Sequence, residues 1–129
     1  MIIPAQIYKI RFNKNSNNYL LDIRDNIDLR LFTLKLNSSE AKNISLAKNN
    51  IFTNRLKTHD LFISLIDLLS IKIDKIIIKK KNDCISSQII LLKGKNELKL
   101  DSFVVDSIVI SLKTFSLIYV DEKLFNNSS

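Results

Sequence analysis

The spacing of apolar residues along the chain constrains its fold more than any other feature of the sequence. In three segments between residues 8 and 36, apolar and polar side chains alternate, which is the pattern of strands with one buried face. Segments that begin at Ser38 and Thr58 instead repeat apolar residues at every third or fourth position, as amphipathic helices do. Further alternating segments and one more helical segment follow. We therefore predict an α+β fold with a mostly antiparallel or mixed sheet and about three helices.

Turn and capping residues divide this pattern into elements. Asn-rich and Asp-rich stretches separate the first strands, and the only glycine, Gly94, stands where a turn between two later strands needs a positive φ. Serines precede the first helix, and Thr58 caps the second, with Asp60 in its first turn. The predicted strands cover about 8–13, 19–25, 29–36, 73–80, 85–92, 97–101 and 117–120, and the predicted helices about 38–47, 58–69 and 104–115.

The same patterns predict which side chains are buried. Cys84 lies in a strand pattern and is expected to be a small core or edge residue rather than a nucleophile. Residues 123–129 are expected to fray. On the second helix, an apolar stripe is expected to face the core, and it consists of Leu61, Phe62, Leu65, Leu68 and Leu69.

Two short segments of the chain are nearly identical. Residues 34–38 read Leu-Lys-Leu-Asn-Ser, residues 98–102 read Leu-Lys-Leu-Asp-Ser, and both lead into a predicted helix. Their spacing of 64 residues also superimposes Ile44 on Ile108. This pattern indicates either an internal duplication of a strand-rich unit that ends in a helix, or chance similarity between two amphipathic strand-to-helix junctions.

Length and composition fit one domain, residues 1–129, with 46% hydrophobic and 26% charged residues. No apolar stretch approaches the roughly 18 residues of a membrane span, so no membrane partner is expected. Residues 1–4 lead almost directly into a strand pattern, from which we expect no signal peptide and no secretion. The net charge of +7 is weak evidence for nucleic acid, because abundant Ile, Lys and Asn indicate an AT-rich genome, that of a plastid or a reduced bacterium.

The rare residue types exclude several kinds of site. One cysteine and one histidine cannot form an internal disulfide or a four-ligand Cys/His zinc site within one chain. One glycine excludes both a P-loop and a dinucleotide fingerprint, so no nucleotide cofactor is expected. A divalent metal would have to be bound by carboxylates, which points to Mg²⁺ or Mn²⁺.

His59 is the first candidate for catalysis, and it lies at the predicted start of the second helix. Free backbone N–H groups there, with Arg55 and Lys57 nearby, suit an anion. A histidine at such a place could act as a base or an acid on a phosphodiester. The alternative is structural: Thr58 caps the helix, Asp60 compensates the helix dipole, and His59 is a half-exposed residue of the first turn.

Asp101 and Asp106 form the second candidate, one at a strand end and the other early in a helix. Two carboxylates at a strand-to-helix junction can hold a metal ion that positions water against a phosphate. The alternative is a helix cap beside a solvated acidic residue.

At these residues the chain resembles a known family. Residues 55–61, Arg-Leu-Lys-Thr-His-Asp-Leu, resemble the Arg-Pro-x-Thr-His-Asp-Leu signature of the bifunctional nuclease family, which is found in bacteria and plant-type lineages. Asp101 together with residues 106–108 resembles that family's Asp-Ala-Arg-Pro-Ser-Asp-Ala-Ile segment, and residues 117–120 resemble its Pro-Ile-Tyr-Val. Glu40, Ala41 and Ile44 fit the family's Glu-Ala helix. The resemblance covers about residues 19–125.

The resemblance implies metal-assisted hydrolysis of DNA and RNA, with nucleic acid as the partner. By position it also implies site residues: Arg55 and Lys57 for phosphate, His59 for proton transfer, Asp101 and Asp106 for the metal, Asp60 as a further catalytic residue, and Glu40 as a weaker candidate.

Two departures from the family pattern bear on this activity. Residues 103–105 are Phe-Val-Val where the family has Arg-Pro-Ser, so that a cationic candidate for phosphate binding has become apolar, and Leu56 replaces a proline. Two hypotheses therefore stand: a nuclease of the plastid stroma or the bacterial cytoplasm, or a catalytically inactive oligomeric or regulatory binding module on the same fold. A homo-oligomer is expected.

Overall fold

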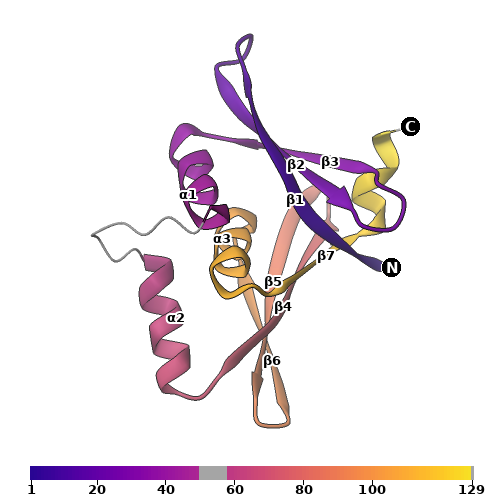
Figure 1. The fold of residues 1–129 in the computed structure, drawn as a ribbon. Helices are drawn as coiled ribbons and strands as arrows, with labels where there is room; N and C mark the ends of the chain where they lie inside the picture. The colour runs from indigo at the N-terminus through magenta and orange to yellow at the C-terminus, as the bar shows by residue number, and fades with distance from the viewer. Residues whose placement is uncertain (50–57, 129) are drawn as a thin grey trace.

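The computed structural model describes residues 1–49 and 58–128, except for the side chains of residues 126–128. Its strands form one seven-stranded mixed sheet in the order β3-β2-β1-β7-β4-β5-β6 (Figure 1). The bounds are β1 Ile2–Asn13, β2 Asn18–Asp25, β3 Leu31–Leu36, β4 Lys72–Lys81, β5 Cys84–Lys93, β6 Asn96–Ser102 and β7 Leu117–Asp121. Together with the helices, this sheet confirms the predicted α+β fold.

Two antiparallel meanders flank the short strand β7. β1, β2 and β3 form one meander, and β4, β5 and β6 form the other. Strand β7 runs antiparallel to β1 and parallel to β4, which makes the sheet mixed. Each meander leads into a helix, and Ile44 and Ile108, which the 64-residue spacing pairs, are both completely buried.

Three α-helices and one 3-10 helix accompany the sheet in the described part of the chain: α1 Ser38–Lys48, α2 Thr58–Leu68, α3 Val104–Thr114 and η1 Glu122–Ser128. The core lies between the sheet and the helices α1 and α3, which pack against each other. In Figure 1, α2 stands apart from the sheet, beside α3. None of the described helices has the length and apolar character needed to cross a membrane.

The cap of α1 is Asn37, one residue before the serines that the sequence suggested. Its side-chain oxygen accepts a hydrogen bond from the backbone N–H of Glu40 at 2.8 Å. The Glu40 carboxylate in turn accepts one from the Asn37 backbone N–H at 2.9 Å. This reciprocal capping box satisfies two N–H groups at a helix start that would otherwise have no partner.

The predicted burial of the α2 stripe is wrong for four of its five residues. Leu61, Leu65, Leu68 and Leu69 are at least half exposed, and Leu68 is 83% exposed. Ile66 is the buried residue of the helix, and Phe62 is half-buried. The reason is tertiary: α2 packs against α3 along one edge and does not lie across the sheet, so the described residues leave most of its apolar stripe exposed.

The expected fraying of residues 123–129 is also wrong for the described residues. Residues 122–128 form the 3-10 helix η1, and Phe125 is completely buried, with its ring edge-on to Phe32 at 6.3 Å between centroids. Burial of an apolar side chain of this size holds η1 against the core. Cys84, expected in the core or at an edge, is exposed at the first residue of β5.

Candidate functional site at the contact of α2 and α3

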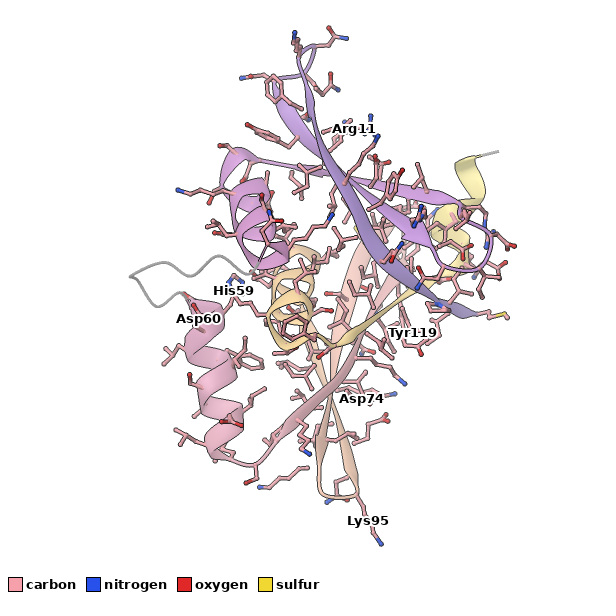
Figure 2. All side chains as sticks on the ribbon, viewed as in Figure 1. Arg11, His59, Asp60, Asp74, Lys95 and Tyr119 are labelled. Carbon is pink, nitrogen blue, oxygen red and sulfur yellow. The ribbon has the colours of Figure 1, made fainter. Side chains whose placement is uncertain are left out.

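Two polar contacts join the first turn of α2 to α3. The His59 Nε2 lies 2.8 Å from Asp106 Oδ1. The Lys113 Nζ donates a hydrogen bond to Asp60 Oδ1, also at 2.8 Å. His59 and Asp60 are neighbours in the sequence, and their partners lie at opposite ends of α3, so the two contacts hold the start of α2 along that helix. Figure 2 shows His59 and Asp60 at the end of α2 that faces α3.

The contact with Asp106 determines what the His59 imidazole can do. An ionised carboxylate can only accept hydrogen bonds, so the His59 Nε2 carries the proton that Asp106 accepts. In the neutral form of the ring the lone pair then lies on Nδ1, and a ring fixed in one tautomer by a carboxylate is the arrangement used by general bases. The His59 side chain is 16% exposed and that of Asp106 is 47% exposed, so the pair lies at the surface of the molecule.

A hollow of about 410 Å³ opens beside this pair, and we call it the α2–α3 hollow. It lies between α2, α3 and the strands β5 and β6, and its lining residues are Thr58, His59, Phe62, Ile89, Leu100, Asp101, Ser102, Asp106 and Ile110. A second hollow, of about 560 Å³, shares Asp101, Ser102 and Asp106 with it and extends to Phe103. The structure therefore brings His59, Asp101 and Asp106 to one place.

Asp101 does not face His59 as directly as Asp106 does. Neighbouring side chains of a strand point to opposite faces of the sheet. Leu100 lies opposite the buried Ile89, whereas Asp101 lies opposite Gln88, whose Nε2 donates a hydrogen bond to Asp101 Oδ1 at 3.1 Å. Asp101 thus borders the hollow at the edge of the sheet, with its carboxylate held on the other face.

The remaining predicted residues lie elsewhere. Arg55 and Lys57, the predicted phosphate-binding residues, are outside the described residues. Asp60 is engaged with Lys113 and is not part of the lining of the α2–α3 hollow. Glu40, the weaker candidate, serves in the capping box of α1.

Sequence reasoning missed Lys113, although its position carried a signal. Asp106, Ile110 and Lys113 are spaced by four and three residues, so they share one face of α3. It also missed a buried pair beneath the site, in which the hydroxyl oxygens of Ser87 and Ser107 lie 2.8 Å apart. The Ser87 hydroxyl also donates to the Ser102 carbonyl oxygen at 2.7 Å, and so ties α3 to β5 and β6.

The donors at the hollow limit which metal ion could be held there. Among the described residues, no group of three or more His, Cys, Asp or Glu side chains is placed to bind an ion. The undescribed residues, 50–57 and 129, include none of these four types. The carboxylates that line the hollow are Asp101 and Asp106. Of these, Asp106 faces the hollow, whereas the Asp101 carboxylate is held by Gln88 on the other face of the sheet. Mg²⁺ often binds through one or two carboxylates together with water and substrate phosphates, so Asp106 with a substrate phosphate fits Mg²⁺ or Mn²⁺.

Comparison with known proteins agrees with the resemblance seen in the sequence. No curated protein is significantly similar to this chain. The family model described as the bifunctional nuclease domain matches residues 20–129, which is most of the chain and contains every residue of the α2–α3 hollow. The chain therefore belongs to the bifunctional nuclease domain family.

Proposed function

We propose that this protein is a nuclease-type hydrolase that cleaves phosphodiester bonds of DNA or RNA with the help of a divalent cation. The observation that carries the proposal is the contact between His59 Nε2 and Asp106 Oδ1 at the α2–α3 hollow. These residues are far apart in the sequence, and a histidine bound to a carboxylate beside a hollow is a recurring arrangement for proton transfer.

In this proposal each residue has a separate task. Asp106 orients the His59 ring, and His59 Nδ1 removes a proton from the attacking water or returns one to the leaving oxygen. The start of α2, at Thr58, lies at the hollow, where backbone N–H groups and the helix dipole favour a phosphate. Arg55 and Lys57 remain predicted phosphate-binding residues.

The cation is part of the same proposal. Asp106 would hold Mg²⁺ or Mn²⁺ at the rim of the hollow, and Asp101 would join it only after its carboxylate leaves Gln88 and turns toward the hollow. A bound cation would neutralise charge on the phosphate and polarise it for attack. Because these carboxylates supply few ligands, we expect binding of the cation to depend on the substrate phosphate.

One observation favours the second candidate, a binding module without catalysis. Phe103 lies at the rim of the neighbouring hollow, is 84% exposed, and stands where the family resemblance leads one to expect a cation. An exposed phenyl ring cannot neutralise a phosphate. It suits stacking against a base or contact with an apolar surface.

The test is cleavage of plasmid DNA and single-stranded RNA by purified protein in Mg²⁺, Mn²⁺ or chelator. We expect cation-dependent cleavage that falls about 100-fold or more in His59→Ala, because general acid–base catalysis contributes about that much. Cleavage is also expected to fall in Asp106→Asn and Asp101→Ala. The matched control is Asp67→Asn, which removes an exposed carboxylate of the same helix α2 and is expected to leave the rate unchanged.

The outcomes separate the two candidates. Cleavage that persists in His59→Ala would indicate a contaminating nuclease and would count against the proposal. Absence of cleavage in every condition, with a folded protein that still binds the labelled nucleic acid in a gel-shift experiment, would support the binding module instead.

A further inference from the structure

Strand β6 is an open edge of the sheet. It pairs with β5 on one side and is the last strand of the sheet order on the other. All its residues except Ser102 are exposed. Edge strands of soluble proteins are commonly protected by charged side chains, a proline, a bulge or a covering segment, and the charges on β6 alternate in sign, so a second copy can pair with them. Strand β6 has no proline, and its register with β5 continues without a shift from Asn96 to Ser102.

The two faces of β6 differ in chemistry. Leu98 and Leu100, which lie opposite the buried Leu91 and Ile89, are 45% and 40% exposed on the face toward the helices. The opposite face carries charges of alternating sign, Glu97, Lys99 and Asp101, and Lys95 stands in the turn just before the strand. Figure 2 shows Lys95 at the tip of the β5–β6 hairpin, projecting away from the rest of the molecule.

We propose that two copies of this chain associate by antiparallel pairing of their β6 strands, with Leu98 on the twofold axis. In this register Glu97 of each copy lies opposite Lys99 of the other, and Lys95 lies opposite Asp101. Glu97 and Lys99 of each strand then meet opposite charges, and Asp101 meets the Lys95 that stands in the turn of the other copy. On the other face Leu98 meets its own copy, which covers an apolar side chain that is exposed in the single chain.

The pattern of charges favours this register over registers in which the axis lies at another residue of β6. Two residues that lie opposite each other in an antiparallel pair are on the same face of the sheet. In a symmetric dimer the twofold axis must therefore pass between the two copies of one residue. An axis at Lys99 would set Lys99 against itself and Glu97 against Asp101. An axis at Glu97 would set Glu97 against itself and Lys95 against Lys99. An axis at Leu100 would keep the Lys99–Asp101 pairs alone and shorten the ladder. Because the strand is complementary to itself, its best partner is a second copy.

This dimer is independent of the proposed nuclease function. It is tested by measuring whether the protein has the mass of a monomer or of a dimer in solution. Sedimentation velocity at micromolar to millimolar concentration is expected to show a dimer for the wild type. Glu97→Lys and Lys99→Glu each set like charges against each other twice, so each is expected to raise the dissociation constant about tenfold or more. The matched control for Lys99→Glu is Lys72→Glu, the same substitution at an exposed residue of β4.

Mixing the two variants makes the test specific. A Glu97→Lys chain opposite a Lys99→Glu chain restores both pairs of opposite charges. The mixture is therefore expected to form heterodimers at concentrations at which neither variant alone forms a homodimer. The double variant is expected to dimerise as the wild type does. Rescue of this kind cannot arise from misfolding, because each chain in the mixture is unchanged from the experiment in which it failed to associate.

A crosslink tests the register directly. In a Cys84→Ser background, Leu98→Cys places two thiols opposite each other across the axis, within the range that a disulfide spans. We expect an intermolecular disulfide under mild oxidation, and none for Lys72→Cys. A wild type that stays monomeric up to millimolar concentration would overturn the proposal. So would a dimer that all the charge variants leave unchanged, because it would use another surface.

Discussion

Asp22 shows how one buried carboxylate can connect three strands. Its side chain is 1% exposed, and it accepts hydrogen bonds from Arg11 at 2.7 and 2.9 Å and from the Thr33 hydroxyl at 2.7 Å. The hydrogen bonds from Arg11 hold the pKa of Asp22 below its ordinary value, against the opposing effect of burial. The carboxylate therefore favours its charged form in the folded protein.

Asp25 also favours its charged form, through a different set of hydrogen bonds. Burial by itself raises the pKa of Asp25, but hydrogen bonds from the backbone N–H groups of Ile27 and Asp28 and from Arg30 outweigh it. The pKa of Asp25 is lowered as a result. These hydrogen bonds close the turn between β2 and β3, so the turn depends on the ionised carboxylate.

These two carboxylates predict acid sensitivity. A lowered pKa in the folded state contributes stability that is complete above the unfolded value of about 3.9, and that is lost as the pH falls through the folded value. We expect the free energy of unfolding, measured with urea, to be level between about pH 5 and 7 from this source and to fall below about pH 4. Asp22→Asn is expected to flatten that fall, and an equally steep fall in the variant would contradict this assignment.

At the scale of elements, α1 combines a capping box with a narrow buried face. The helix contains serines, lysines and asparagine, and its buried residues are Ala41, Ile44 and Ala47. The two alanines supply little apolar area, so the burial of α1 rests mainly on Ile44. The capping box of Asn37 and Glu40 determines where the helix starts.

Removal of the cap has a predictable cost. Asn37→Ala is expected to lower the free energy of unfolding by about 1 kcal/mol, because Ala cannot accept the hydrogen bond from the backbone N–H of Glu40. Asn37→Asp and Asn37→Ser keep an acceptor and are expected to stay within about 0.5 kcal/mol of the wild type. Chemical denaturation followed by circular dichroism measures the difference. Equal losses in all three variants would mean that something other than the cap was disturbed.

At the scale of the whole molecule, the C-terminal residues connect the two meanders. Helix η1 packs against β3, β4 and β7, and the Glu122 backbone N–H donates to the Met1 carbonyl oxygen at 2.9 Å. Phe125 contacts Phe32 of β3, and the Arg30 guanidinium lies over its ring at 5.6 Å. Phe125 is therefore part of the core.

Phe125→Ala tests this role. We expect a loss of about 3–5 kcal/mol in the free energy of unfolding, the usual cost of removing a fully buried phenyl ring. The matched control is Phe103→Ala, which removes a ring that is 84% exposed and is expected to change stability by less than about 0.5 kcal/mol. Similar small effects for both variants would show that η1 is not anchored by Phe125 in solution.

The candidate site was predicted in part. Sequence patterns and the family resemblance identified His59, Asp101 and Asp106 as residues of interest, and the structure brings all three to one hollow. They did not identify the direct contact of His59 with Asp106, because it joins residues 47 positions apart on two different helices. The face to which Asp101 points depends on the register of β6 with β5, which no local pattern specifies.

The sequence by itself determined the kind and order of the elements, because alternation, helical spacing and turn residues act within a few neighbouring positions. It also determined the family, through residues 55–61 and the segments that follow. Only the tertiary structure decided which apolar stripes are buried. The leucines of α2 are exposed and Phe125 is covered because burial depends on the surface that a distant segment presents, and periodicity carries no information about that surface.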